Sequence, residues 1–327
     1  MPQKYALISV SDKTNIEQIA KTISNSGYLI ISTGGTAKTL SNAGIKVIPV
    51  KNITGNPECF DGRMKTISFQ IEGGILYDRK NINHVKEAKK LNVPRIEIVI
   101  CNLYPFEKTI SNKSAKLENA IENIDVGGPT MIRSAAKNFK NVLVITDPSD
   151  YLKILPLIKK GKISEKLKQK LAAKAFYHLS LYDCIIAKYL NSEDFPNEIT
   201  IPARKLVDLR YGENPHQKGA IYIEPNSNSP FSSLKQIAGR GLSLTNITDI
   251  NAGLESIKMF KEPAVAVIKH NSPCGIALGK NTSEALGRAI ESDPGSAFGG
   301  VIVINKKLDI ECAKVIEQFK KEGRGNF

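Results

Sequence analysis

The 327-residue chain is predicted to be an α/β protein that begins with an open parallel sheet carrying helices on both faces. Short apolar runs alternate with helix-like segments over about the first 147 residues, which is the pattern of such a sheet. A long helical stretch and a polar, proline-bearing segment follow, and then a second α/β region begins. A chain of this length is expected to form two domains, each able to bury its own core.

Five apolar runs in the first region are predicted to be buried strands. Between the first two, Ile16, Ile19, Ala20 and Ile23 recur at helical spacing, and Gly27 stands where a helix would end. The predicted strands are 5–10, 28–32, 46–50, 97–102 and 142–146.

The later part of the chain is divided by a predicted linker at 191–198, which is polar and contains a proline. Before it, leucines and alanines close to one face predict a helix over 164–190. After it come an apolar run at 264–268, a helical segment at 284–291 and an apolar run at 301–304. We therefore predict a first domain over 1–147, a helical connection and linker over 148–203, and an incomplete second domain over 204–327.

Composition argues against a disulfide scaffold and gives no sign of a metal site. The five cysteines are an odd number, are scattered and never form a C-x-x-C pair, which is typical of reduced thiols. The apolar stretch at the N-terminus is too short for a signal peptide or a membrane span. We expect a soluble, cytoplasmic protein with no membrane partner.

The formal net charge of +14 predicts attraction to polyanions. Lysines are distributed along the chain, and there is no tryptophan for base stacking. A phosphorylated metabolite is therefore preferred to a dedicated nucleic-acid partner. A basic nucleic-acid-binding protein stays the alternative from another class.

Ligand-binding loops are predicted where apolar runs end. Ser11-Asp12-Lys13, Thr33-Gly34-Gly35-Thr36 and Asn102-Leu103-Tyr104 each follow such a run, and ligands of open α/β sheets bind beyond the carboxyl ends of the strands. The second loop opens a helix, whose N–H groups and dipole favour a phosphate. A plain tight turn there, and a helix N-cap at Ser11 or Asp12, are the structural alternatives.

Two further segments of this region carry groups suited to acid–base chemistry. Arg63-Met64-Lys65-Thr66 places two cations and a hydroxyl in one loop that could reach a phosphate or a developing oxyanion, or be solvated surface charge. Asp125 precedes a glycine pair and a helix that runs to Lys137. If Asp125 folds back over that helix, the two residues can form a proton-transfer pair; otherwise Asp125 is a helix-dipole partner.

The second region contains two dense polar motifs. The segment from Arg210 to Gln217 is rich in side chains that recognise anions and planar rings. Lys269-His270 follows an apolar run, so both side chains stand at a strand end, where His270 is a candidate general base or a structural histidine. Cys274 is interpreted as a packed thiol rather than a nucleophile.

Together these motifs resemble the bifunctional phosphoribosylaminoimidazolecarboxamide (AICAR) formyltransferase/inosinate (IMP) cyclohydrolase family. The ordered segments that carry the resemblance extend over essentially the whole chain: Ser11 to Thr14, Thr33 to Lys38, Arg63 to Thr66, Cys101 to Phe106, Asp125 to Gly128, Arg133 to Lys137, Arg210 to Gln217, Lys269-His270 and Ser296 to Gly300.

The resemblance implies the last two steps of IMP synthesis: formyl transfer from 10-formyltetrahydrofolate to AICAR, then cyclodehydration of the product, FAICAR. It also implies a methylglyoxal-synthase-like first domain, a cytidine-deaminase-like second domain without catalytic zinc, no metal requirement for ring closure, and a homodimer.

The resemblance also assigns roles to residues. Lys65 and Tyr104 are expected to act on the oxygen during ring closure, and Asp125 and Lys137 on the protons. In formyl transfer, His270 would accept a proton and Lys269 would polarise the formyl oxygen. The residues expected to bind nucleotide are Ser11, Asp12, Lys13, Thr33, Gly34, Gly35, Thr36, Arg63, Thr66, Cys101, Asn102, Val126, Gly127, Arg210, Tyr211, His216, Phe298 and Gly299.

Two features depart from the family pattern. The segment from Ile67 to Glu72 stands where the family usually has Leu-His-Pro and a further histidine, which affects the local wall of the first site. The family's second domain also continues well past Phe327, so we expect little or no formyl transfer from the chain as given. A phosphate-binding lyase or a ligand-sensing domain of the methylglyoxal-synthase-like fold is the alternative, but neither explains the motifs at 210–217 and 269–270.

Overall fold

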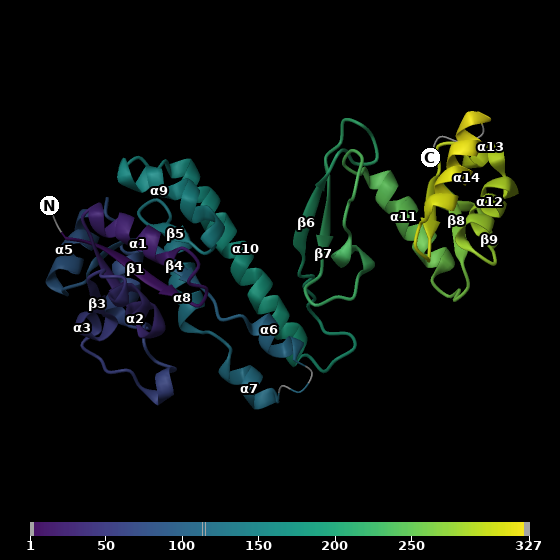
Figure 1. Ribbon diagram of the computed structural model, residues 1–327. Helices are drawn as coiled ribbons and strands as arrows, with labels where there is room; N and C mark the ends of the chain where they lie inside the picture. The colour runs from purple at the N-terminus through teal and green to yellow at the C-terminus, as the bar shows by residue number, and fades with distance from the viewer. Residues whose placement is uncertain (1–2, 113, 115, 324–327) are drawn as a thin grey trace. The chain divides into compact units, whose positions relative to one another are not determined.

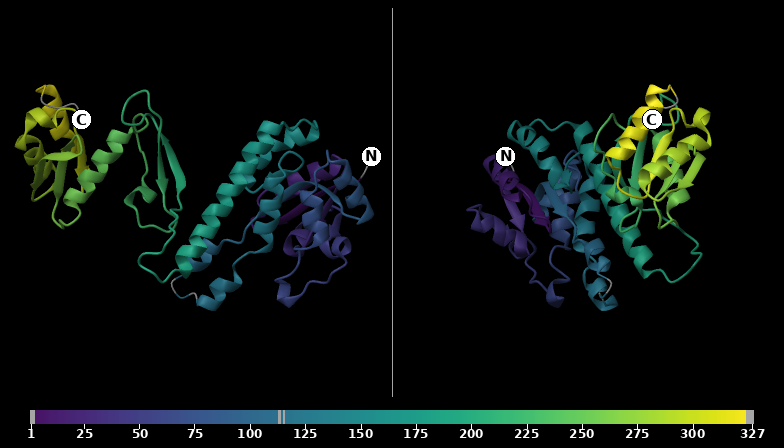
Figure 2. Two further views of the ribbon diagram at one scale, coloured as in Figure 1. Left: turned by 180° about the vertical axis from the view of Figure 1, so that it is seen from behind. Right: turned by 45° about the vertical axis from the view of Figure 1, so that its right-hand side comes forward.

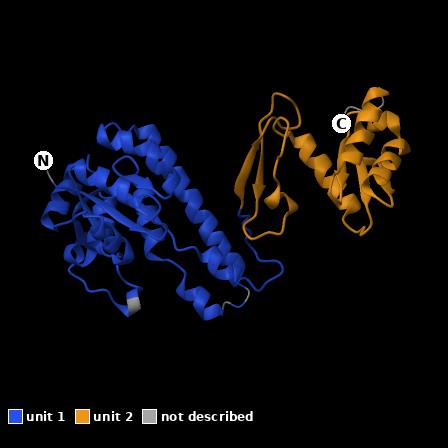
Figure 3. Cartoon of the chain, viewed as in Figure 1, with its two compact units in different colours: residues 1–202 blue, residues 203–327 orange. Residues whose placement is uncertain are grey.

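The computed structural model describes residues 3–323 except 113 and 115. It divides into two compact units, residues 1–202 and 203–327, which Figure 3 shows in blue and orange. Each unit is described by itself.

The first unit is built on a five-stranded parallel sheet with the strand order β3-β2-β1-β4-β5 (Figure 1). The chain proceeds from the central β1 to β2 and β3 on one side, and later to β4 and β5 on the other. In register, Ile8 lies beside Ser32 and Val10 lies beside Asn102. The strands are β1 (Lys4–Val10), β2 (Tyr28–Ser32), β3 (Val47–Pro49), β4 (Arg95–Asn102) and β5 (Leu143–Ile145).

Helices cover both faces of this sheet, as the sequence predicts, and each face has its own apolar core. One core joins the sheet to α1, α2 and α9, and the other joins it to α4, α8 and α10. The helices of the unit are α1 (Ile16–Asn25), α2 (Gly34–Asn42), α3 (Val50–Thr54), α4 (Phe69–Leu76), α5 (Ile82–Lys90), α6 (Phe106–Ser111), α7 (Leu117–Glu122), α8 (Gly127–Lys137), α9 (Tyr151–Lys159) and α10 (Glu165–Leu190), with short 3₁₀ turns at Phe60–Gly62 and Pro148–Asp150.

The helical connection predicted over 148–203 lies almost wholly within the first unit. Ala175 and Leu179 of α10 are buried in its core, and the helix packs against α8 and β5. Figure 2 shows this long teal helix along the first unit from two further directions. Helical periodicity alone could not reveal this packing, because an apolar stripe shows that a helix is covered without showing by what.

Three helices between β3 and β4 were not predicted from the sequence. The strand expected over 46–50 ends at Pro49, and α3 starts at Val50. In α4, the Gly73-Gly74 pair weakens helix propensity, but the close approach of the segment at Pro94 requires glycine at 74. A Cβ at Gly74 would lie 2.6 Å from the carbonyl oxygen of Pro94.

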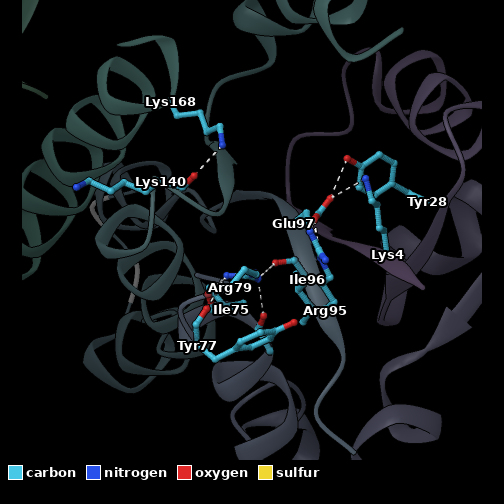
Figure 4. A network of polar contacts seen from close by, with 11 residues as sticks. Lys4, Tyr28, Ile75, Tyr77, Arg79, Arg95, Ile96, Glu97, Lys140 and Lys168 are labelled. Atoms are coloured by element: carbon cyan, nitrogen blue, oxygen red, sulfur yellow. Dashed lines mark hydrogen bonds and ion pairs between the residues drawn. The ribbon is translucent and has the colours of Figure 1, made fainter. Parts of the chain in front are cut away.

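A partly buried arginine joins the end of α4 to β4 (Figure 4). The Arg79 guanidinium donates to the carbonyl oxygens of Gly74 (2.9 Å), Tyr77 (2.9 Å), Ile75 (3.2 Å) and Ile96 (2.5 Å). Burial lowers the pKa of Arg79. These bonds satisfy carbonyl groups that the last turn of α4 leaves open, and so hold β4 in place.

The second unit contains two small antiparallel sheets. The sequence predicted an α/β region here, which the helices and strands bear out, but its main sheet, β10-β8-β9, is antiparallel. The elements are β6 (Arg204–Leu209), β7 (Gly219–Ile223), a 3₁₀ turn at Pro230–Ser233, α11 (Leu244–Ile257), β8 (Ala264–Lys269), β9 (Ser272–Leu278), α12 (Thr282–Ser292), α13 (Pro294–Ala297), β10 (Val301–Ile304) and α14 (Ile310–Lys321).

Candidate functional site

The first candidate site lies at the carboxyl ends of β1, β2 and β4, where the order of the sheet reverses. The side-chain oxygen of Asn102 accepts hydrogen bonds from the backbone N–H groups of Ser11 (2.7 Å) and Asp12 (2.9 Å). Its amide donates to the carbonyl of Asp12 (3.0 Å). The loops after β1 and β4 therefore meet as predicted, and Asn102 acts in the structure as the brace between them.

Asp12 is engaged in a local turn before α1. One of its carboxylate oxygens accepts hydrogen bonds from the N–H (2.9 Å) and the hydroxyl (2.7 Å) of Thr14. The bond from the Thr14 hydroxyl, followed by that from its backbone, holds the pKa of Asp12 below its usual range. This is a local Asx turn and not a helix cap. The N-cap residue of α1 is Asn15, with no side-chain capping bond, so the N-cap that the sequence offered at Ser11 or Asp12 is wrong.

The start of α2 has the features of an anion site. Gly34 has φ +54°, a conformation that glycine adopts without strain. The hydroxyl of Thr33, the N-cap residue, makes no capping bond to the helix. The Lys13 ammonium lies 3.8 Å from where a Cβ of Gly35 would be. N–H groups at the helix start and a nearby cation together favour a phosphate.

Two predicted nucleotide-binding residues are oriented away from such a role. The Thr36 hydroxyl is buried, donates to the carbonyl of Val10 (3.0 Å) and accepts from its N–H (3.1 Å). The Cys101 thiol is buried beside the carbonyl of Gly128, and burial raises its pKa. The side chains of Thr36 and Cys101 thus stabilise the strand ends, which leaves their backbones as the groups that could contact a ligand.

A carboxylate that sequence reasoning missed joins two of the predicted motifs. Glu58 accepts a hydrogen bond from the Thr33 hydroxyl (2.9 Å) through one oxygen, and its other oxygen lies 3.6 Å from the Lys65 ammonium. Backbone hydrogen bonds between Cys59 and Met64 (3.2 and 3.3 Å) close the intervening loop. A lone glutamate with no motif around it carried no signal in the sequence.

Lys65 is also confined by the loop itself. Gly62 has φ +93°, and a Cβ there would lie only 2.5 Å from the Lys65 Cε. The Lys65 side chain therefore lies across a position that only glycine leaves open. The neighbouring Arg63 forms an ion pair with Glu122 of α7.

Asp125, Thr66 and the Tyr104 backbone meet at the start of α8. Asp125 accepts a hydrogen bond from the N–H of Gly128 (2.8 Å) and one from the backbone of Tyr104. Burial outweighs these bonds and raises the pKa of Asp125. A Cβ at Gly127 would lie 2.8 Å from the Thr66 hydroxyl, which places the end of the Lys65 loop at this helix. Tyr104 is 56% exposed, and Val126, which follows Asp125 in the chain, is 60% exposed.

The structure does not bring Asp125 and Lys137 together. Asp125 caps the first turn of α8 and does not fold back over the helix, whereas Lys137 is the exposed last residue. The ten residue steps from Gly127 to Lys137 correspond to about 15 Å of helical rise. Within one chain, therefore, the two residues do not form the direct pair that their spacing allowed.

In the second unit, Lys269 and His270 stand at the hairpin between β8 and β9. The Lys269 ammonium donates to the carbonyl of Phe298 (2.6 Å), and Gly299 follows with φ +69°. His270 and Asn271 form the two-residue turn with φ of +50° and +66°, values that glycine and asparagine favour. A histidine in this conformation is a local strain of the kind found at functional sites.

Arg210 and Tyr211 lie near the same helix as this hairpin. The Arg210 guanidinium stacks 4.7 Å from the centre of the Tyr211 ring, and bonds to Ser243 and Arg210 lower the pKa of Tyr211. The carbonyl of Tyr211 accepts from the N–H of Leu244 (3.1 Å) at the start of α11. Asp249 of α11 in turn accepts from the N–H of Asn271 (2.7 Å).

The five residue steps from 244 to 249 correspond to about 7.5 Å along a helix. Both motifs of the second region are therefore attached to the first half of α11. His216 is exposed in the turn at 212–217, which backbone and side-chain bonds of Gln217 close.

Within 3–323 as described, no three His, Cys, Asp or Glu side chains are arranged to hold a metal ion. Among the helices of that part of the chain, none is both long and apolar enough to cross a membrane.

Comparison with known proteins identifies relatives of both units. A family model described as AICARFT/IMPCHase bienzyme matches residues 135–323, and one described as an MGS-like domain matches residues 15–130. The bifunctional purine biosynthesis protein PurH of Acetivibrio thermocellus is 50% identical over 321 residues, which are 96% of this chain and 62% of that protein. PurH of Ruminiclostridium cellulolyticum is 49% identical with the same coverage.

A solved structure titled "Crystal structure of ForH" is 32% identical with a TM-score of 0.50, and the match covers 58% of this chain and 99% of that one. The chain spans 62% of the length of the curated relatives named above.

Proposed function

Since the chain belongs to the AICARFT/IMPCHase bienzyme family, we propose that its first unit closes the purine ring, converting FAICAR to IMP with loss of water. The observation that carries this proposal is the meeting of Thr66, the Tyr104 backbone and Asp125 at the start of α8, with Lys65 next to Thr66 in the chain, on the same strand ends as the uncapped start of α2. The group at α8 suits acid–base chemistry, and the start of α2 suits a phosphate.

The phosphate of the nucleotide would bind at the start of α2. There the N–H groups of Gly34 and Gly35 and the Lys13 ammonium offer positive potential, and the hydroxyl of Thr33 does not compete for the helix. The braced loop at Ser11 and Asp12 forms the adjoining wall. A phosphate held there anchors one end of the substrate, so that the imidazole ring at the other end can reach Asp125 at the start of α8.

Ring closure needs positioning more than strong chemistry. The carboxamide nitrogen attacks the formyl carbon of the same molecule, a C–N bond forms, and the formyl oxygen becomes an alkoxide that takes a proton. The attacking nitrogen and the formamide nitrogen each lose one proton, and the oxygen takes up a second proton and leaves as water, which completes the aromatic ring. Because nucleophile and electrophile are tethered, alignment supplies much of the rate.

Lys65 would stabilise the developing oxyanion, with the Tyr104 hydroxyl beside it. Asp125 would take the proton from nitrogen, a role that its burial favours because a raised pKa makes a carboxylate a better base. Lys137 stays a candidate for the second proton transfer, although its place at the far end of α8 requires another route to the substrate.

The direct test is to supply the purified chain with FAICAR and follow the appearance of IMP. We expect turnover by the wild type and a loss of about a hundredfold in kcat for Lys65→Ala, because an oxyanion partner is removed. Lys86→Ala, which changes an exposed lysine of α5, is the matched control and should turn over normally. Absence of IMP with correctly folded wild type would refute the proposal.

A second candidate function is binding of AICAR by the second unit, as part of the formyl-transfer reaction that uses 10-formyltetrahydrofolate. The hairpin that carries Lys269 and His270, and the Arg210–Tyr211 stack, are both attached to the first half of α11. This favours a site for a planar, phosphorylated substrate. The separate assay supplies AICAR and the formyl-folate, so each half-reaction is measured without the other.

The proposal includes a cytoplasmic location and a homodimer, and the resemblance implies the homodimer. A supporting observation is that Leu206, Val207 and Tyr222 of the β6–β7 hairpin are exposed apolar side chains. A two-stranded sheet is marginal in water without cover. Light scattering coupled to size-exclusion chromatography should give twice the chain mass; a monomer at micromolar concentration would contradict it.

A further inference from the structure

Glu58 is the one charged side chain in the described part of the first site whose two oxygens contact both the start of α2 and the Lys65 loop. One oxygen accepts the Thr33 hydroxyl at 2.9 Å, and the other lies 3.6 Å from the Lys65 ammonium. Thr33 is the N-cap of α2, and Lys65 belongs to the loop that leads to α4. The glutamate thus links the start of α2 to the Lys65 ammonium.

A contribution to folding stability does not account for this arrangement. The Glu58 and Lys65 side chains are 49% and 34% exposed, and their charged atoms are 3.6 Å apart. Exposed ion pairs contribute about 0–1 kcal/mol, since water screens them and two flexible side chains must be ordered. A pair of this kind has little structural value by itself.

The charge of Glu58 is also unfavourable for binding an anion nearby. A carboxylate bonded to the N-cap of α2 repels a phosphate at the same helix start. A carboxylate in that position is useful only if it orders other groups by more than it repels the ligand. The two groups it orders are a hydroxyl and a cation.

The Thr33 hydroxyl is the first of these. Threonine at an N-cap ordinarily turns its oxygen to the helix and accepts a hydrogen bond from an N–H of the first turn. Here the hydroxyl donates to Glu58 instead and makes no capping bond. The Thr33 hydroxyl therefore does not occupy the N–H groups at the start of α2, and these groups remain available to a ligand.

We propose that Glu58 is a positioning residue of the ring-closure site: it fixes the Lys65 ammonium for the formyl oxygen and withdraws Thr33 from the start of α2, where the phosphate binds. This inference rests on the function proposed for the first unit. Gly62 is also needed for this positioning, because a Cβ at residue 62 would collide with the Lys65 side chain.

Two substitutions separate the effect of Glu58 on Lys65 from its effect on Thr33. Glu58→Gln keeps an oxygen for Thr33 but removes the charge that holds Lys65, so kcat for FAICAR should fall about tenfold while KM stays within about threefold. Glu58→Ala also releases Thr33 to cap α2, so KM should rise in addition, by about fivefold or more. Glu87→Gln, an exposed carboxylate of α5, is the matched control and should match the wild type.

Two further measurements distinguish positioning from a general structural effect. In the Lys65→Ala background Glu58→Gln should cause no additional loss of kcat, because the group it acts through is gone. Independently of activity, the rate of reductive methylation of Lys65, followed by peptide mass spectrometry against Lys89 of α5, should rise severalfold in Glu58→Gln.

The outcomes keep this inference apart from the proposed function. If wild type forms no IMP, the ring-closure proposal fails, and the methylation rate still reports whether Glu58 holds Lys65. If wild type turns over and Glu58→Gln has kcat within twofold of it, the positioning role is refuted. An unchanged methylation rate at Lys65, or a full additional loss in the Lys65→Ala background, overturns it equally.

Discussion

At the scale of single residues, the strand-end site contains side chains that serve the backbone and side chains that remain for a ligand. The side-chain oxygen of Asn102 accepts hydrogen bonds from two backbone N–H groups, and the Thr36 hydroxyl bonds to the backbone of Val10. Lys13 and Lys65 instead carry their charges at the start of α2 and in the loop before α4. Residues in one motif therefore differ in role, since some hold the loops in place and others provide the positive charge.

Glu72 is a buried carboxylate at the segment where the sequence departs from the family pattern. One oxygen accepts the Ser134 hydroxyl of α8 at 2.5 Å, and the other is buried with no hydrogen-bond partner among the described residues. Burial raises the pKa of Glu72 despite the bond from Ser134. The ionised form therefore costs folding free energy at neutral pH.

Glu72→Gln should stabilise the first unit at pH 7, by at most about 1 kcal/mol once solvent screening is allowed for. Because the folded-state pKa is raised, protonation stabilises the folded wild type below the unfolded-state pKa, and this contribution is lost as the pH rises through the folded-state value. The advantage of Gln should thus shrink as the pH falls to about 4. Urea unfolding at both pH values measures it; an equal gain at both would contradict the assignment.

At the scale of elements, the Arg79 side chain supplies hydrogen-bond donors to carbonyl groups that the end of α4 leaves without a helical partner. Its guanidinium bonds carbonyls at the end of α4 and in β4, which positions the strand whose far end carries Asn102. Nearby, Glu97 of β4 accepts the Tyr28 hydroxyl at 3.1 Å and pairs with Arg95. Burial, with the nearby Glu97 charge, raises the pKa of Tyr28 to about 12.

Arg79→Met should destabilise the first unit by about 3 kcal/mol, because it removes a partly buried donor from four carbonyl groups, of which only those of Ile75 and Tyr77 keep the Asn138 amide as a partner. Lys80→Met, which changes the exposed neighbouring cation, should stay within about 0.5 kcal/mol of the wild type. Chemical denaturation of both variants checks this, and equal effects of the two substitutions would show that Arg79 is not the anchor.

At the scale of the whole molecule, the charge of +14 bears on how substrates are attracted. If the positive potential acts on a phosphorylated nucleotide, the KM for FAICAR should rise severalfold between 0.05 and 0.5 M salt while kcat changes little. Steady-state kinetics at the two ionic strengths tests this. Tight, steeply salt-dependent binding of random DNA would instead favour the nucleic-acid alternative.

Much of the first unit could be predicted because its signals are local. Apolar runs located all five strands of its sheet to within two residues at each end, and the loops after β1, β2 and β4 were expected to meet because parallel strands end at one edge. The helices from α3 to α7 escaped prediction. In α4 in particular, the requirement for glycine comes from a neighbour, Pro94, and not from the helix itself.

By itself, the sequence determined the α/β class, the strand-end motifs and the resemblance that the comparisons support. Only the tertiary structure decided that α10 belongs to the first unit, that Asp125 caps α8 away from Lys137, and that Glu58 joins Thr33 to Lys65. The physical reason is that spacing along a chain reports periodicity and local turns. The partner of a given oxygen or ammonium group depends on how distant segments pack, and no local pattern encodes that.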